Sequence, residues 1–295
     1  MAIAAASAQT PLVRADRPFR SGIELTSLTA TVTDAEGRPV TDLDRSAFEV
    51  YEDGSRQDIT QFTRDRVPVG LGVLLDTSDS MFGQRIQDAR AIVDRFLFEL
   101  LDASDEFFIL AFNHTPKTLT GWTHTPGEVR RALSGLRPFG GTAAYDAVVD
   151  SLPMIERRSR QRAALLIISD GADTASSATI RDVKSALLRS DAFVYAIAID
   201  SPERQAINAR VNAEALREIT SQSGGRTEVV RDSAELAEAS ARIADELNHQ
   251  YVLGYTSTHG ADGQYHSIRV RVHGSDYRVR ARNGYVATPV RGTGR

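Results

Sequence analysis

The sequence predicts an α/β protein with a doubly wound, mainly parallel sheet covered by helices on both faces, joined to a small β-sandwich. First, the unbroken apolar run from Val69 to Leu75 has the composition of a strand buried on both faces, and an amphipathic helix follows it. Second, strand and helix patterns alternate from there to Gln250. Third, both ends of the chain alternate apolar and polar residues, as antiparallel strands do.

The N-terminal part reads as a short antiparallel unit. Leu25–Thr33 alternates with Thr and Val, which favours a strand, and Phe48–Tyr51 forms a second candidate. Asp53-Gly54 is a strong hairpin signal, so Ile59–Phe62 is expected to pair back on the preceding strand. Strands this short make a thin core by themselves, and we expect them to need a partner.

The middle of the chain has the alternation of a parallel α/β unit. The first helix is expected to begin near Gln84 and to bury a face that ends at Leu100. Further strands are expected over Glu106–Phe112, Ala163–Ser169, Phe193–Ile199 and Thr227–Val230, and helices over Pro126–Leu136, Thr142–Arg157, Ile180–Ser190, Asn212–Ser221 and Ser233–Gln250. Right-handed crossovers then place helices on both sides of the sheet.

The pattern returns to β after Gln250. Strands are expected over Tyr251–Thr256, Tyr265–Val272 and Tyr277–Val286. These strands supply the partner that the N-terminal unit lacks, so both ends should form one sandwich. The expected division is a terminal segment 1–21, an N-terminal β segment 22–66, an α/β domain 67–250, a C-terminal β segment 251–288 and a disordered tail 289–295.

Composition limits the possible functions. The chain has 295 residues, 41% of them hydrophobic and 25% charged, with a net charge of −4 and no cysteine. Disulfides, thiolate metal sites and cysteine nucleophiles are therefore excluded, and the charge gives no reason to expect a nucleic-acid partner. No apolar run approaches the length of a transmembrane helix.

The segment Met1–Gln9 is similar to the tail of a secretory signal. Ala6-Ser7-Ala8 fits a small-residue cleavage site, whereas the basic n-region is missing. A disordered Ala-rich terminus explains the same residues equally well. We expect a secreted, periplasmic or cell-envelope location.

Oxygen donors follow several of the expected strands. Asp76, Ser78 and Ser80 come directly after the first buried strand, Thr142 follows a double glycine, and Asp170 ends the run that begins at Arg162. If the sheet is parallel, the three loops that carry them meet at one edge, where α/β proteins bind ligands. Carboxylate and hydroxyl oxygens suit Mg²⁺, Mn²⁺ or Ca²⁺.

In order and spacing, these residues resemble the three-part metal-ion-dependent adhesion site of the von Willebrand factor type A (VWA) domain. The resemblance extends over about Val67 to Gln250. The flanking β segments are similar to those of a bacterial group, the VWFA-related proteins, described mainly from Acidobacteria. Asp79 departs from the commonest pattern, because many members have Gly there.

The resemblance implies a function and a set of ligands. One Mg²⁺ or Mn²⁺ ion would be held by Asp76, Ser78, Ser80, Thr142 and Asp170. The ion would accept an Asp or Glu carboxylate from a partner protein, as in divalent-cation-dependent adhesion without catalysis. Weaker candidates for a supporting role are Asp79, Asp146 and Asp173.

Other interpretations stay open. Each Ser, Thr or Asp could instead cap a helix. The same metal could serve a Mg²⁺-dependent hydrolase or phosphotransferase, with His114 as the nearest candidate base, or the motif could survive in a structural scaffold of the cell envelope. We interpret His259, His266 and His273 as surface or edge residues, and the arginines that alternate after Arg269 as a solvated face or as partners of local acids.

Overall fold

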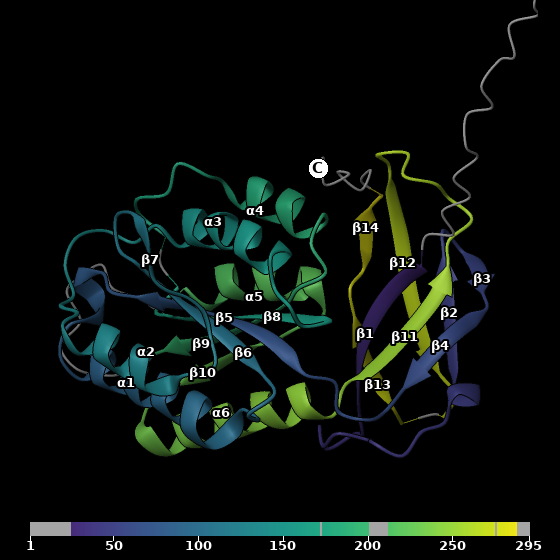
Figure 1. The fold of residues 1–295 in the computed structure, drawn as a ribbon, viewed down its shortest axis with the longest axis horizontal. Helices are drawn as coiled ribbons and strands as arrows, with labels where there is room; N and C mark the ends of the chain where they lie inside the picture. Colours follow the sequence, from purple (N-terminus) through teal and green to yellow (C-terminus); the bar gives the residue numbers. More distant parts are fainter. Residues whose placement is uncertain (1–24, 172, 201–211, 275, 288–295) are drawn as a thin grey trace, which may run out of the picture.

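The computed structural model describes residues 25–171, 173–200, 212–274 and 276–287. The signal-like segment Met1–Gln9 and the expected tail 289–295 lie outside these ranges. The described chain forms an α/β unit and a β-sandwich that lie side by side (Figure 1). The domain boundaries expected at 67 and 250 fall where the chain passes between these two parts, and they stay a prediction.

The central sheet confirms the mainly parallel architecture. Its strand order is β10-β9-β8-β5-β6-β7. The strands are β5 (Val69–Asp76), β6 (Glu106–Phe112), β7 (Pro116–Thr123), β8 (Arg162–Ser169), β9 (Phe193–Ile199) and β10 (Thr227–Val230). All neighbouring pairs are parallel except β6 and β7. The edge strand β7 was not predicted from the sequence, because its partly exposed residues do not form an apolar run.

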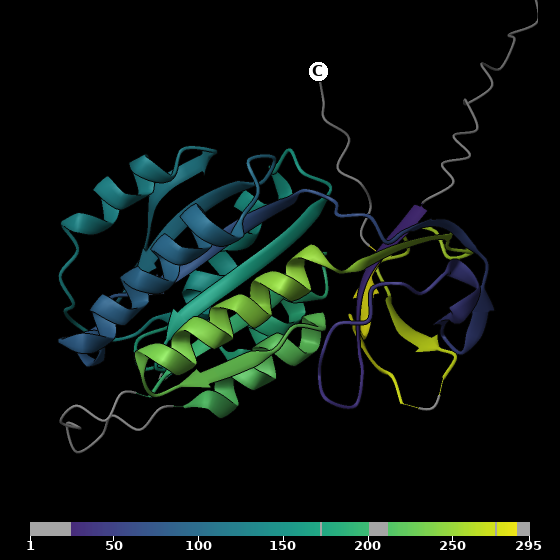
Figure 2. The same cartoon turned by 90° about the horizontal axis from the view of Figure 1, so that it is seen from below.

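Helices cover both faces of this sheet, as expected. They are α1 (Gln84–Arg95), α2 (Pro126–Ser134), α3 (Ala144–Glu156), α4 (Ile180–Leu187), α5 (Ala213–Ser223) and α6 (Ser233–Asn248). Residues of α1, α2 and α6 share one core with the sheet, and residues of α3, α4 and α5 share the other (Figure 2). A π-helical turn, Phe96–Leu100, extends α1. Within the described ranges, no helix combines the length and apolarity needed to cross a membrane.

The sandwich is built from both ends of the chain. Its strands are β1 (Leu25–Thr33), β2 (Phe48–Glu52), β3 (Ser55–Gln57), β4 (Ile59–Thr63), β11 (Tyr251–Thr256), β12 (Tyr265–Val272), β13 (Arg278–Ala281) and β14 (Gly284–Val286). They form two sheets with the orders β13-β1-β11-β4 and β14-β12-β2-β3. Each sheet mixes N-terminal and C-terminal strands, so the expected shared sandwich is confirmed.

Two details of the expected pairing were wrong. Ile59–Phe62 does not pair back on β2; β3 takes that place, and β4 crosses to the other sheet to pair with β11. The single strand expected over Tyr277–Val286 is broken into β13 and β14, which belong to different sheets. In both cases the chain passes from one sheet to the other within one or two residues. The alternation of apolar and polar residues does not reveal such a change of sheet.

The sandwich packs on the end of the α/β unit where its parallel strands begin. Arg280 of β13 forms an ion pair with Glu246 of α6 at 2.6 Å, and the backbone N–H of Val286 donates to Leu188 O at 2.8 Å. A side chain at Gly224, which also has a positive φ, would collide with the backbone of Ala281. The carboxyl ends of the strands therefore face away from the sandwich (Figure 1).

Candidate metal site

The first loop of the candidate site begins at a fully buried carboxylate. All eight residues of β5 are buried, and the strand ends at Asp76. Asp76 Oδ1 accepts a hydrogen bond from the backbone N–H of Ser78 at 2.8 Å, and Oδ2 accepts one from Ser169 Oγ at 2.5 Å. These two bonds hold the carboxylate in one orientation at the carboxyl end of the sheet.

The two serines of this loop present their hydroxyls side by side. Ser78 Oγ and Ser80 Oγ lie 3.0 Å apart. Neither side chain caps a helix: a short 3₁₀ turn starts after Ser78 without a side-chain cap bond, and α1 starts after Gly83. Thr142 is not a cap either, because α3 starts after Ala143. The capping interpretation is therefore wrong for these three hydroxyls.

The second loop, which carries Thr142, is attached to the first by backbone hydrogen bonds. The N–H of Phe139 donates to Thr77 O at 2.9 Å, and the N–H of Asp79 donates to Gly140 O at 3.0 Å. Gly140 has a φ of +78°, a conformation that glycine adopts without strain. Thr142 is buried beside these contacts.

The third loop begins at Asp170, directly after β8, and reaches the second loop. The backbone N–H groups of Thr174 and Ala175 donate to Thr142 O at 2.9 and 3.0 Å. In return, Thr142 N donates to Thr174 Oγ1 at 2.9 Å. The three expected loops are thus joined at one edge of the sheet.

The buried carboxylate of Asp76 makes this edge electrostatically unfavourable in its charged form. Burial raises the pKa of Asp76 to about 7; hydrogen bonds from Ser169 and Ser78 oppose the rise, and the negative charge of Asp170 adds to it. Close carboxylates repel each other in a low-dielectric site. Two carboxylates next to serine and threonine hydroxyls fit a hard divalent cation such as Mg²⁺.

Arg85 is the residue that the sequence analysis missed. Its Nη1 lies 3.1 Å from Asp170 Oδ2 and 3.0 Å from Ser80 O, and both charged side chains of this ion pair are buried. Arg85 belongs to the first turn of α1, directly behind the serine loop. It therefore links the first and third loops and places a fixed positive charge beside the candidate ligands.

Replacing Arg85 is expected to strengthen cation binding. In Arg85→Gln, the repulsion between the guanidinium and an incoming Mg²⁺ is removed, so the affinity for Mg²⁺ should rise by roughly tenfold. Isothermal titration calorimetry with Mg²⁺ measures this affinity. The control is Arg95→Gln on the same helix, about 15 Å farther along its axis, which should leave the affinity unchanged. Weaker binding by Arg85→Gln would show that Arg85 organises the ligands instead.

The three weaker candidates have different surroundings. Asp79 is exposed in the first loop. Asp146 accepts hydrogen bonds from the backbone of Ser177 and Ala178 at 2.9 and 2.8 Å. Asp173 accepts from Tyr145 N at 3.0 Å and from Ser176 Oγ at 2.6 Å, among other bonds. Asp146 and Asp173 thus brace the third loop against α3.

Two exposed aromatic side chains lie on the same loops. Phe82, two residues after Ser80, is 77% exposed, and Phe139 in the second loop is 55% exposed. His114, the candidate base of the hydrolase interpretation, packs edge to face on Phe139 with ring centroids 5.6 Å apart. Phenylalanine is enriched at protein interfaces relative to the rest of the protein surface.

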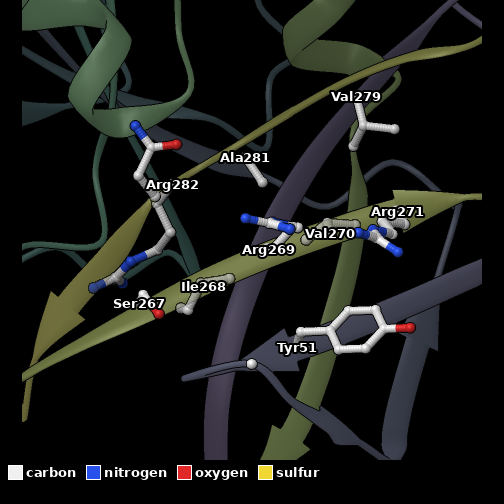
Figure 3. A pocket seen from close by; sticks show the side chains of 11 residues that line it. Tyr51, Ser267, Ile268, Arg269, Val270, Arg271, Val279, Ala281 and Arg282 are labelled. Atoms are coloured by element: carbon white, nitrogen blue, oxygen red, sulfur yellow. The ribbon is translucent and has the colours of Figure 1, made fainter.

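A separate groove of about 540 Å³ lies in the sandwich, between β12 and β13 (Figure 3). Arg271 lies over the ring of Tyr51 with its guanidinium carbon 5.3 Å from the ring centroid, and Arg282 lies over Tyr285 at 5.2 Å. Arg280 instead pairs with Glu246 of the α/β unit. Arg280 thus has an acidic partner, as expected, although that partner lies in the α/β unit. Arg271 and Arg282 instead lie over aromatic rings, which the sequence did not predict.

Comparison with known proteins defines the class. Residues 71–172 match the family model of the von Willebrand factor type A domain. With the doubly wound sheet and the joined strand-end loops, this shows that the chain contains a VWA domain, a fold that often mediates protein–protein interaction. No curated protein sequence matches the chain.

Solved structures support the fold. A von Willebrand factor type A protein from Catenulispora acidiphila is 12% identical with a TM-score of 0.53, over 91% of this chain and 75% of that one. An aerotolerance-related membrane protein from Bacteroides fragilis is 20% identical with a TM-score of 0.51, over 61% and 98%. The conserved hypothetical protein BatB from Bacteroides thetaiotaomicron is 20% identical with a TM-score of 0.50, over 60% and 98%. At these identities the likeness concerns the fold alone.

Proposed function

We propose that this protein is a divalent-cation-dependent protein-binding module that recognises a carboxylate on its partner. The ion, Mg²⁺ or Mn²⁺, is held by Asp76, Ser78, Ser80, Thr142 and Asp170. The observation that carries the proposal is the burial of two carboxylates, Asp76 and Asp170, among hydroxyl donors on joined strand-end loops. Arg85 compensates the charge of Asp170, whereas the charged form of Asp76 is costly to bury without a further cation.

The charge of the site supports recognition of an anion. A divalent ion with Asp76 and Asp170 alone would be formally neutral. The buried guanidinium of Arg85, 3.1 Å from Asp170, leaves one positive charge in excess. When bound, the cation supplies a coordination position for an oxygen from outside the chain. An Asp or Glu carboxylate would complete its shell and compensate the excess charge.

The surroundings support a protein as the bearer of that carboxylate. Phe82 and Phe139 offer exposed apolar area beside the candidate ligands. Aromatic side chains are frequent anchors at protein interfaces. The edge also lies at the end of the α/β unit away from the sandwich, where a partner can approach it (Figure 1). We further propose a location outside the cytoplasm, in line with the signal-like segment Met1–Gln9.

The test is partner capture from an envelope extract of the source organism, with Mg²⁺ and with a chelator. Wild type should retain a partner only with Mg²⁺, and Thr142→Ala should lose it in both conditions, because a neutral ligand of the ion is removed. Equal retention in all four conditions would contradict the proposal. A turnover screen with phosphate and ester substrates, run on the same samples, separates binding from the hydrolase interpretation.

The exposed aromatic residues give a second prediction. Phe139→Ser should weaken metal-dependent capture by roughly tenfold or more, the effect of truncating an aromatic anchor. Its metal affinity should stay unchanged, because Phe139 is joined to the serine loop through its backbone N–H and its ring contacts His114 rather than a candidate ligand. The matched control is Phe98→Ser, which is 45% exposed in the π-helical turn after α1. Equal weakening by both variants would place the partner elsewhere.

A further inference from the structure

A second cluster of metal-ligating side chains lies in the sandwich, far from the VWA loops. Asp53, His259 and His266 each offer one ligand atom, and these atoms all lie within 4.8 Å of one another. Asp53 Oδ2 is 2.8 Å from Nδ1 of His266 and 3.6 Å from Nε2 of His259. The two imidazole rings are stacked, with centroids 4.2 Å apart.

The sequence interpretation of these histidines was wrong for one of them. His266 is only 4% exposed, because its strand, β12, lies between β14 and β2. The centroid of its imidazole ring lies 5.6 Å from that of the Tyr285 ring. His259 and Asp53 are partly exposed. A buried imidazole thus faces an accessible carboxylate and a second, accessible imidazole.

We infer that Asp53, His259 and His266 form a binding site for a transition-metal ion of the zinc type. Two imidazole nitrogens and one carboxylate oxygen are a common ligand set for Zn²⁺, which leaves a fourth position for water or for an outside donor. Ligand atoms around a tetrahedral zinc ion stand roughly 3.3 Å apart, given bonds of about 2.0–2.1 Å. The 2.8 and 3.6 Å separations bracket this value.

The hydrogen bonds around the cluster favour the ligand role. Nε2 of His266 lies 3.2 Å from Asp262 Oδ1. A carboxylate at that nitrogen holds the proton on Nε2 and directs the Nδ1 lone pair toward the shared centre, an arrangement typical of metal-bound histidines. Asp53 Oδ1 accepts from the N–H of Ser267 at 2.8 Å and from its hydroxyl at 3.1 Å. Oδ2 therefore stays directed at the two imidazoles.

Rigid backbone presents these side chains. Asp53 has a φ of +48° and Gly54 a φ of +80°, so the predicted Asp-Gly turn between β2 and β3 is present. The preceding residue, Glu52, is fully buried and accepts hydrogen bonds from Tyr255 at 2.7 Å and Tyr285 at 2.8 Å. The turn is thus anchored in the sandwich core, and a bound ion would join it to the β11–β12 loop and to β12.

The competing interpretation is an ion pair without metal. Burial lowers the pKa of His266, but hydrogen bonds to Asp53 and Asp262 raise it above its usual value. A doubly protonated imidazole between two carboxylates would also hold the turn in place. Only the metal site, however, gives the partly exposed His259 a necessary part, so His259 separates the two interpretations.

The experiment titrates the full chain with Zn²⁺, and with Co²⁺ as a spectroscopic probe of tetrahedral nitrogen and oxygen ligation, in excess Mg²⁺. Wild type should bind one Zn²⁺ ion. His259→Gln and His266→Gln should each weaken this binding at least tenfold, and Asp262→Asn by roughly 10- to 100-fold. His273→Gln, an exposed histidine near Glu49 on the same strand pair, is the matched control and should bind as wild type does.

Two results would overturn the inference. One is zinc affinity in His259→Gln equal to that of wild type, which would leave only the ion pair. The other is loss of zinc binding in Asp76→Asn, which would place the ion at the VWA loops. Because His259 lies on a partly exposed loop, its variant keeps the core intact, and a far-ultraviolet circular dichroism spectrum identical to wild type verifies this.

Discussion

Mg²⁺ is expected to raise the thermal unfolding midpoint of the wild-type protein, and Asp76→Asn is expected to abolish this rise while stabilising the metal-free protein. The carboxylate of Asp76 is fully buried, and its pKa is raised from 3.8 to about 7. A raised pKa means that the charged form opposes folding. The opposition is absent below about pH 4, grows as the pH rises and is complete above about pH 7.

The pKa shift of Asp76 and the binding of Mg²⁺ also set the expected size of each change in stability. An Asn at position 76 keeps the shape of the side chain and removes the charge, so metal-free Asp76→Asn should be more stable at pH 8 by about 2 kcal/mol or more. The advantage should disappear at pH 4. Saturating Mg²⁺ at about 100 times its Kd should stabilise wild type by about 2.7 kcal/mol, and this variant not at all.

Differential scanning fluorimetry with Mg²⁺ or with a chelator, at pH 8 and pH 4, measures both effects. The control is Asp79→Asn, an exposed carboxylate in the same loop, which should behave as wild type does. A rise in midpoint with Mg²⁺ that survives in Asp76→Asn would refute the ligand assignment. A metal-free Asp76→Asn less stable than wild type would show that its hydrogen bonds outweigh its charge.

The candidate metal edge was predictable because its parts are local. A buried run such as β5 identifies a strand from composition alone, and the oxygen donors come directly at its end. Parallel topology then brings separate strand ends to one edge. Arg85 could not be assigned in this way, because its partner Asp170 is 85 residues away and neither position carries a pattern. Its pairing depends on how α1 lies against β8.

The histidine cluster also depends on a long-range contact that no sequence pattern predicts. Asp53 and His266 are 213 residues apart, and their contact requires β2 and β12 to be neighbours in exact register. The sequence predicted that the two ends of the chain form one sandwich, but not that β2 and β12 pair. A one-residue shift in register moves every side chain to the other face of a sheet. Burial of His266 therefore could not be read from alternation.

Leu253→Ala is expected to destabilise the sandwich by about 3 kcal/mol, the cost of emptying a well-packed site of this size. Leu253 is fully buried in β11, directly opposite Leu28 of β1 and Phe62 of β4, so both N-terminal strands should be loosened. Limited proteolysis read by mass spectrometry should then show faster cleavage within 25–63. Leu25→Ala is the matched control, because Leu25 is 41% exposed.

Truncation after Gln250 extends this prediction to the whole sandwich. It removes β11 from between β1 and β4 and β12 from beside β2, so each sheet loses its pairing between the two ends of the chain. The segment 25–63 should become fully sensitive to protease. The α/β unit has its own two cores and should stay protected and keep its Mg²⁺ affinity. Continued protection of 25–63 in the truncated chain would contradict the shared core, because it would show that the N-terminal strands stay folded without β11 and β12.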